Sequence, residues 1–283
     1  MIPHTAMTGR GHDPSGRERG ETRGGRQTDL DAPTMFNLRT LQRHRIVLET
    51  ASPLWSRLRG MEDYESPEWH PAFEEYCETI YELEEDDLDV IQARIADRLE
   101  VSRPSVSEMV KRMEAEGLID IGEKITLTAQ GMHLAETVVR RHRLAERFLT
   151  DVLNLSWAQA HQEAGKWEHI ISPTVEKAMM DLLDEPTTCP HGNPIPGSDY
   201  ETPDLVTLNT IEVGENLTIR RITEELEFTE GMLDFLEESS IVPGSKGRLS
   251  AKSPDGTSTV IIDGTPVVVG GFASARILVS APT

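Results

Sequence analysis

Two helical patterns separated by a short turn constrain the fold of this chain more than any other feature. Over residues 89–100 the apolar side chains recur at the spacing of a buried helix face. A second pattern of the same kind covers 105–116, and Gly117 predicts where that helix ends. Between the two, Ser102 is suited to cap the second helix and Pro104 to lie in its first turn. The sequence therefore predicts two helices that meet across a tight turn.

A hairpin pattern follows this helix pair. Two β-prone segments, around 118–121 and 125–128, are separated by a Gly-Glu-Lys turn, and a further helical pattern at 73–83 precedes the pair. Helices in this order followed by a hairpin are typical of a winged helix-turn-helix, whose second helix enters the major groove of DNA. We expect this DNA-binding domain to occupy residues 66–130.

The start of the second helix carries side chains suited to contact with DNA. Its serine hydroxyls are small enough for close approach to phosphates and base edges. Lys111 and Arg112, one turn further along, can neutralise phosphate, and Glu108 can accept a hydrogen bond from a cytosine amino group. The predicted DNA-contacting residues are Arg94, Ser102, Arg103, Pro104, Ser105, Ser107, Glu108, Lys111 and Arg112. A winged helix used only for protein contacts is the alternative.

The whole chain is strongly acidic, with 28 Lys and Arg against 49 Asp and Glu and a net charge of −21. This sum argues against a simple nucleic-acid binder, although the local charge of the docking surface matters more. An excess of carboxylates also suits a protein that binds cations. The sequence contains no run of 18 apolar residues, no signal-peptide core and only two cysteines. We therefore expect a cytoplasmic protein with no membrane partner.

Three further regions accompany the predicted DNA-binding domain. Residues 1–65 have few placeable apolar positions, and we expect a disordered or undefined extension there. Residues 131–205 carry three helical patterns and then a Pro- and Gly-rich linker. Residues 206–283 alternate apolar and polar side chains in short runs bounded by Gly and Pro, which is typical of a small β-barrel. The predicted fold class is α+β, mainly α.

Glu and His residues recur at helical intervals in three separate stretches. Side chains at such intervals share one face of a helix, where unpaired carboxylates are costly to bury unless a cation binds them. Nitrogen and carboxylate oxygen together suit first-row metals such as Mn, Fe, Co, Ni and Zn. Solvated faces or ion pairs with neighbouring arginines are the alternative for any single stretch. The residues concerned are Glu75 and Glu78, His142 and Glu146, and His161, Gly165, Glu168 and His169.

The same segments resemble the diphtheria-toxin-repressor family of iron- and manganese-dependent repressors. The resemblance is close over about 68–197, and the C-terminal region looks like the family's SH3-like (FeoA-like) domain. It implies a winged helix-turn-helix, a helical metal-binding and dimerisation domain over 131–205, and an SH3-like domain over 206–283. It rests on the segments EEYCETIYELEE, ARIADRLEVSRPSVSEMVKRMEAEGLI, RRHRLAERFLTDVLNL, HQEAGKWEHIIS and CPHGNPIPG.

The resemblance implies two metal sites per subunit. The ancillary site takes His142, Glu146 and His161, together with ligands from the C-terminal domain. A gapless alignment puts Thr229 and Met232 at those last positions, so Glu227 or Glu230 is the expected substitute. The motif with Cys189 and His191 is interpreted as a structural loop because its prolines fix a turn.

The primary site implied by the resemblance takes Glu168, His169 and residues of the first helix. The first helix offers Glu75 and Glu78, which match the carboxylate pattern of the manganese-responsive members. One turn before Glu168 the family has cysteine or glutamate, whereas this chain has Gly165. The candidates to replace that missing ligand are Glu163, Glu78, Cys77 and water.

The function predicted from these features is metal-dependent repression of transcription. A homodimer loaded with Mn(II) binds double-stranded operator DNA, with Fe(II), Zn(II) or Co(II) as alternative activators. A metalloenzyme is the competing class, because metal sites that lack one protein ligand can be catalytic. An adaptor protein whose β domain binds a peptide is a third hypothesis for the function. No nucleophile or phosphate-binding loop accompanies the His and Glu residues, so we expect no enzyme.

Overall fold

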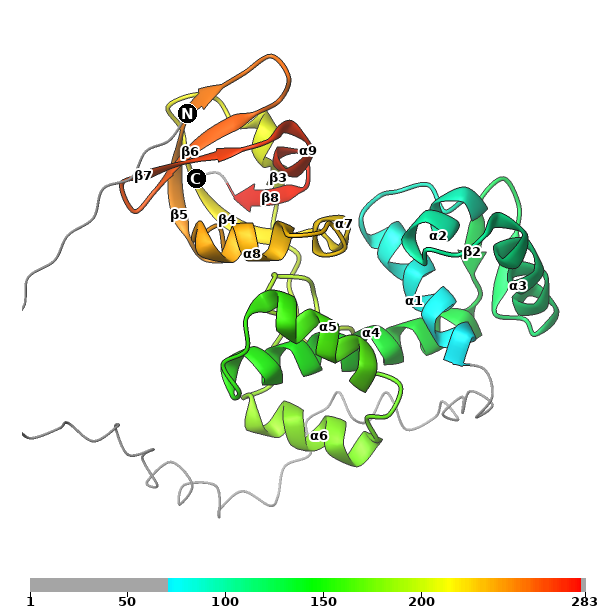
Figure 1. The fold of residues 1–283 in the computed structure, drawn as a ribbon. Helices are drawn as coiled ribbons and strands as arrows, with labels where there is room; N and C mark the ends of the chain where they lie inside the picture. Colours follow the sequence, from blue (N-terminus) through cyan, green and yellow to red (C-terminus); the bar gives the residue numbers. More distant parts are fainter. Residues whose placement is uncertain (1–70, 281–283) are drawn as a thin grey trace, which may run out of the picture. The chain divides into compact units, whose positions relative to one another are not determined.

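The computed structural model describes residues 71–280, whose buried apolar side chains form three clusters (Figure 1). One cluster lies within 73–138 and another within 144–183. The third joins Trp157 to side chains between 208 and 279. The extension expected at 1–65 lies outside the described residues. Residues 71–280 thus form an N-terminal core of helices and a hairpin, a second core of helices alone, and a C-terminal β core.

The apolar core within 73–138 belongs to the winged helix-turn-helix that the sequence predicts. The Ser102 hydroxyl accepts a hydrogen bond from the Ser105 amide at 3.2 Å and so caps the second helix of the motif. Gly117 follows the end of that helix with φ of 75°, a conformation that glycine adopts without strain. The elements are α1 (Pro71–Glu85), α2 (Gln92–Arg98), α3 (Arg103–Ala115) and the antiparallel strands β1 (Ile119–Ile121) and β2 (Ile125–Leu127).

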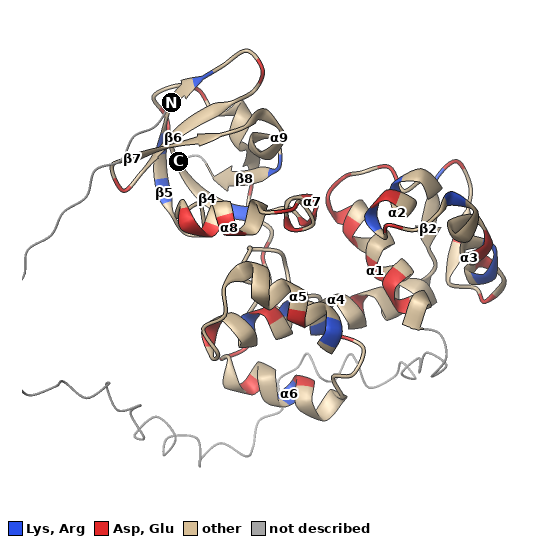
Figure 2. Ribbon diagram, viewed as in Figure 1, with Lys and Arg blue, Asp and Glu red and all other residues tan. Residues whose placement is uncertain are grey.

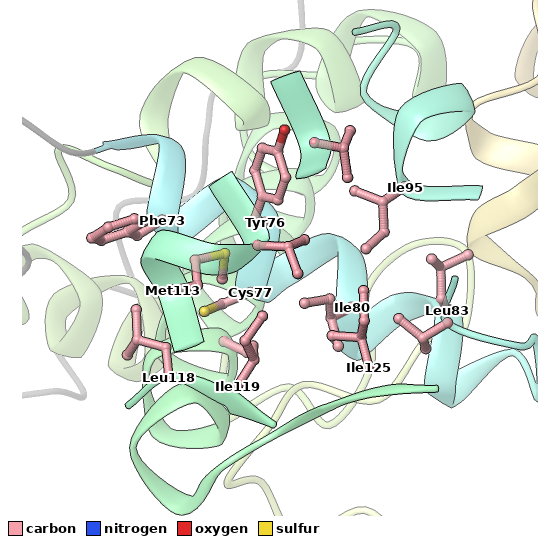
Figure 3. Close-up of a cluster of buried hydrophobic side chains, with 14 of the residues drawn as sticks. Phe73, Tyr76, Cys77, Ile80, Leu83, Ile95, Met113, Leu118, Ile119 and Ile125 are labelled. Carbon is pink, nitrogen blue, oxygen red and sulfur yellow. The ribbon is translucent and has the colours of Figure 1, made fainter. Parts of the chain in front are cut away.

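Side chains from α1, α3 and the hairpin interlock in the core of this domain (Figure 3). Phe73 and Ile80 of α1, Met113 of α3, and Ile119 and Ile125 of the hairpin are each at most 4% exposed. Burying a side chain of this size contributes on the order of 1.5–3 kcal/mol. Helix α1 is therefore an integral part of the DNA-binding domain, and any contact made by its other face acts on that domain.

Helix α4 (Ala129–Asp151) connects the DNA-binding core to the helical core. Leu134 and Val138 in its first half pack in the apolar core of the DNA-binding domain. Leu144 and Leu149 in its second half pack with α5 and α6. Near its start, a Cβ on Gly131 would lie 2.0 Å from the Leu118 carbonyl oxygen, so only glycine allows this approach. The other helices are α5 (Trp157–Trp167) and α6 (Pro173–Leu182), capped by Ser156 and Ser172. No helix within 71–280 is long and apolar enough to cross a membrane.

The C-terminal domain is a six-stranded antiparallel sheet in the order β3-β8-β4-β5-β6-β7. Five of its strands coincide with the alternating runs of the sequence. The elements that the sequence did not predict are short, namely β3, η3, α7 and α9. The bounds are β3 (Val206–Thr207), η3 (Leu208–Thr210), β4 (Asn216–Ile222), α7 (Glu224–Glu227), α8 (Met232–Glu238), β5 (Lys246–Lys252), β6 (Ser258–Ile262), β7 (Thr265–Val269), α9 (Gly271–Ser274) and β8 (Ile277–Ser280).

Candidate metal centre

His142 of α4 lies at the centre of a group of buried Glu and His side chains. Its Nδ1 is 2.5 Å from Glu168 Oε2 at the end of α5 and 4.0 Å from Glu78 Oε1 on α1. One potential ligand atom from each of the three side chains lies within 4.8 Å of the others. We call Glu78, His142 and Glu168 the first cluster. It takes one residue from the DNA-binding domain and two from the helical domain.

A second group of side chains begins at the other nitrogen of the same ring. His142 Nε2 is 3.3 Å from Glu146 Oε1 and 3.3 Å from His161 Nδ1. His161 Nδ1 is also 3.0 Å from Glu146 Oε1 and 3.4 Å from Oε2 of Glu227, at the end of α7. Helices α4 and α5 and the C-terminal domain therefore meet at this point.

The loop after α6 contributes Cys189 and His191 to this second group. His191 is fully buried, and its Nδ1 is 2.8 Å from Glu227 Oε2 and 3.6 Å from Glu146 Oε2. Cys189 and His191 offer ligand atoms that, with one from Glu146, lie within 4.8 Å of one another. The next residue, Gly192, has φ of +90°, and a Cβ there would lie 2.1 Å from the Arg220 carbonyl oxygen. We call His142, Glu146, His161, Cys189, His191 and Glu227 the second cluster, which shares His142 with the first.

His169 extends the first cluster along α1. Its Nε2 is 3.1 Å from Glu168 Oε1 and 3.6 Å from Glu75 Oε1. Its Nδ1 is 2.6 Å from Glu74 Oε2, a partner that the sequence analysis did not name. Glu74 precedes Glu75 on the same helix turn, so only the orientation of α1 in the folded chain decides which of the two is nearer.

Apart from Glu78, whose pKa is raised well above the usual value by burial and by Glu168, the carboxylates and imidazoles of the two clusters hold one another in charged states. Burial disfavours the charged imidazole of His142, but Glu146 and Glu168 raise its pKa well above the usual value. For the same reason Glu146 and Glu227 raise the pKa of His161, to about 9. Burial opposes ionisation of Glu168, yet His142 and His169 lower its pKa to about 2. Without a cation, imidazolium groups thus balance the buried carboxylates.

Protonated histidines do not satisfy every buried polar atom of the clusters. Buried atoms without a hydrogen-bond partner include Glu78 Oε1, Glu146 Oε2, Glu227 Oε2, His169 Nε2 and both ring nitrogens of His191. Several of them lie close together at ion-pair distance but outside hydrogen-bond geometry, as His191 Nδ1 and Glu227 Oε2 do at 2.8 Å. Unpaired buried polar atoms are costly, and lone pairs that converge in this way are typical of a metal site. The donor set fits divalent metal ions.

Gly165 leaves open space beside the first cluster. A Cβ built on Gly165 would have no atom within 4 Å. The glycine lines a cavity of about 310 Å³ together with Glu78, His142 and Glu168. The side chain that the resemblance implies at this position is therefore absent, and no atom of residues 71–280 lies within 4 Å of the position that its Cβ would take.

The structure brings most of the predicted metal-binding residues together in the two clusters. Three residues proposed to replace missing ligands lie outside both clusters. Glu230 is exposed and is a member of neither cluster, whereas Glu227 is buried within the second. Glu163 is also outside, because its carboxylate pairs with Lys166 on the surface at 2.7 Å. Cys77 faces the apolar core between α1 and α3. Of the residues named to replace the missing ligand, only Glu78 lies in the first cluster.

His191 is the functional candidate that the sequence analysis set aside. The CPHGNPIPG motif forms a turn, and this turn also inserts the imidazole of His191 between Glu146 and Glu227. A cysteine and a histidine two residues apart were the available signal. The burial of the loop against β4 could not be deduced from that spacing.

The predicted DNA-contacting residues lie at the exposed start and along one side of α3. Ser102, Arg103, Pro104 and Ser105 are exposed, as are Glu108, Lys111 and Arg112 further along, while Ser107 is half-buried. Arg94 of α2 donates to the Asp89 carbonyl at 2.6 Å. Figure 2 shows basic positions on α2 and α3 beside acidic ones. Arg98 of α2 adds no exposed charge there, because its side chain is buried and pairs with Glu82.

A second set of buried ion pairs fastens the C-terminal domain to the end of α1. Arg143 is fully buried and donates to both oxygens of Glu85, at 3.0 and 2.7 Å, and to Glu224 of α7 at 2.7 Å. Arg221 of β4 reaches Glu85 at 2.9 Å and Asp86 at 2.7 Å. Breaking such a buried pair on one side is strongly destabilising, because an uncompensated charge remains.

A winged helix-turn-helix whose first helix enters a buried Glu and His cluster defines a class, the metal-responsive DNA-binding proteins. Comparison with known proteins identifies the family. Residues 70–125 match the model "Iron dependent repressor, N-terminal DNA binding domain", and residues 128–197 match "Iron dependent repressor, metal binding and dimerisation domain".

Individual relatives extend this match beyond those two domains. The chain is 38% identical over 204 residues to the iron-dependent repressor IdeR of Mycobacterium tuberculosis, covering 68% of this chain and 88% of that protein. A structure titled "Manganese-dependent transcriptional repressor complex with manganese" is similar with a TM-score of 0.68 and 30% identity, over 74% of this chain and all of that one. The structure of the manganese regulator SloR has a TM-score of 0.61 and 30% identity, over 74% and 98%.

The chain therefore belongs to the diphtheria-toxin-repressor family of metal-dependent transcriptional repressors. The winged helix-turn-helix, the helical domain and the C-terminal β domain together reproduce the predicted fold class. The family consists of repressors rather than enzymes, as the sequence analysis expected.

Proposed function

We propose that this protein represses transcription when Mn(II) occupies the first cluster, by binding operator DNA as a homodimer in the cytoplasm. The observation that carries the proposal is the position of Glu78. It lies on α1 of the DNA-binding domain, yet its buried carboxylate faces His142 and Glu168 of the helical domain. A bound divalent ion supplies positive charge that neutralises these carboxylates, and the three residues then hold α1 against α4 and α5.

The donor set supports Mn(II) for the first cluster. Carboxylates from Glu78 and Glu168, with Glu75 near His169, make it rich in hard oxygen donors. The similar structure named above was solved with manganese, which agrees with this assignment. Fe(II) is the second candidate, because IdeR is named iron-dependent and the second cluster adds nitrogen and sulfur donors.

The helical domain supports a homodimer. Apolar side chains of α6 and of the turns that follow α4 and α5 remain exposed, with Leu182 58% and Ile170 78% exposed. Exposed apolar side chains gathered on neighbouring elements mark interaction surfaces. A second copy of the chain that covers this face places two copies of α3 at a fixed spacing, as recognition of a palindromic duplex requires.

The test is operator binding as a function of metal. An operator is first selected from a library of palindromic duplexes with the Mn(II)-loaded full-length protein. Affinity for that duplex is then measured by fluorescence anisotropy with Mn(II), Fe(II) under anaerobic conditions, Co(II), Zn(II) or chelator. We expect at least a 100-fold tighter complex with Mn(II) than with chelator, and a steep salt dependence. Equal affinity with and without every metal contradicts the proposal.

A further inference from the structure

Phe228 occupies a position between the second cluster and the helix-turn-helix. Its ring meets the His161 ring edge to face, with centroids 5.2 Å apart and an interplanar angle of 86°. On another side it lies under the guanidinium group of Arg98 on α2, with 4.2 Å between the Arg98 Cζ and the ring centroid. One side chain of the C-terminal domain thus touches both a candidate metal ligand and the DNA-binding domain.

Arg98 depends on this ring more than a surface arginine would. Its side chain is only 6% exposed, and within the described part of the chain its one ion pair, to Glu82 of α1, is long at 3.3 Å. The other terminal nitrogen, Nη2, is buried and has no hydrogen-bond partner. A cation over an aromatic ring is worth more when the cation is desolvated, and here the guanidinium group is buried while the Phe228 ring is half exposed. The Phe228 ring therefore contributes to holding α2 and α1 together through Arg98 and Glu82.

The backbone links the position of this ring to the second cluster. Phe228 directly follows Glu227, whose carboxylate lies 2.8 Å from His191 and 3.4 Å from His161. Phe228, Arg98 and His161 also line the same cavity as the first cluster. Any interaction that fixes Glu227 and His161 restricts Phe228 from two sides.

We propose that Phe228 is a positioning residue that transmits occupancy of the second cluster to α2 of the helix-turn-helix through Arg98. The inference rests on the proposed function, because it assumes that a divalent ion binds Glu227 and His161. With those two residues held, the Phe228 ring stays against the guanidinium group, and α2 keeps the orientation that presents α3 to DNA. Coupling of this kind between two sites is reciprocal and is measured as a ratio of affinities.

The experiment measures that ratio in the full-length protein. Operator affinity is determined by anisotropy with chelator and with saturating Mn(II), for the wild type, F228L, F228Y and F272L. Phe272 is a matched control, because it is similarly exposed and lies under Arg276 at 3.8 Å in the same β domain. Mn(II) stoichiometry and affinity without DNA are measured by calorimetry for each protein, and thermal unfolding monitors the fold.

We expect F228L to lower the ratio of the two operator affinities about five-fold, with two Mn(II) still bound per chain. F228Y retains the ring and should keep the wild-type ratio, as should F272L. An unchanged ratio in F228L overturns the inference. An equal loss of affinity with and without Mn(II) also overturns it, because the effect is then on folding alone. A wild type without metal-dependent binding instead rejects the proposed function, and the inference with it.

Discussion

The two candidate metal clusters share His142 but differ in what they join. The first cluster connects α1 of the DNA-binding domain to α4 and α5 and, apart from His142, consists of carboxylates. The second connects α4 and α5 to the loop after α6 and to α7, with two further imidazoles, a thiol and only two carboxylates. The comparison suggests that the first cluster governs DNA binding directly, while the second governs how firmly the C-terminal domain is attached.

The largest effect is expected when the first cluster loses a ligand without loss of volume. Glu168→Gln removes the carboxylate that contacts both His142 and His169, so α1 is no longer held against α5. We expect metal-activated operator affinity to fall at least 100-fold in the anisotropy assay. Glu163→Gln, on the exposed side of α5, is the matched control and should change it less than two-fold. Wild-type activation in Glu168→Gln would exclude the first cluster as the activating site.

A smaller loss is expected when the second cluster is altered at His191. His191→Gln should reduce bound Mn(II) from two ions to one per chain, because Glu146 and Glu227 lose the imidazole between them. Operator affinity at saturating Mn(II) should fall about ten-fold, since the first cluster remains complete. Metal analysis after dialysis and the anisotropy assay measure the two quantities. A loss as large as that of Glu168→Gln would remove the distinction between the clusters.

A gain is expected when the open position in the first cluster is filled. Gly165→Glu places a carboxylate in the cavity beside Glu78 and Glu168, where a Cβ meets no atom within 4 Å. Replacing a helical glycine also favours the helix by roughly 0.5–1 kcal/mol. We expect several-fold tighter Mn(II) binding by calorimetry, with the second site unchanged. Weaker binding at the first site would show that this cavity serves another purpose.

The smallest effect is expected from a rise in pH, which should lower the Tm of the apo protein and increase the gain in Tm that Mn(II) causes. The folded-state pKa of His161, about 9, lies above its usual value, so the protonated imidazole stabilises the apo protein fully below pH 6.5. That contribution disappears as the pH rises from 6.5 to 9, and the apo Tm should fall by a few degrees. Metal ligands must be deprotonated, so the Tm gain caused by Mn(II) should grow over the same range. A metal-induced gain that shrinks with pH would contradict the ligand assignment.

The helices and most strands could be predicted from the sequence because their signals are local. Ser102, Pro104 and Gly117 act within one turn of their own positions, so the bounds of the second helix of the motif followed directly. The first helix, expected over 89–100, is shorter and covers only Gln92–Arg98. Glu78, His142, Glu146, His161 and Glu168 could likewise be proposed from helical spacing and family resemblance, and the structure groups all five. Short elements such as α7 depend on packing against distant residues, and they were missed.

The residues that could not be predicted are those whose roles depend on contacts far apart in the sequence. Glu74 meets His169 across 95 positions, and nothing in either segment favours Glu74 over Glu75. A gapless alignment gave Thr229 and Met232 as the ligand positions of the C-terminal domain, whereas the structure places the carboxylate of Glu227 beside His161. Arg98 occupies a position where the helix pattern indicates an exposed basic side chain. In the structure this side chain is buried, and it contacts Phe228 and Glu82.

The most direct test of the two-cluster account is a crystal of the full-length protein grown with Mn(II), with anomalous differences measured on the manganese absorption edge. The account predicts an anomalous peak in contact with Glu78, His142 and Glu168, and a separate one bounded by Glu146, His161 and Glu227. A map with manganese in the second cluster alone, or at neither, would contradict the claim that metal binding holds α1 of the DNA-binding domain in place.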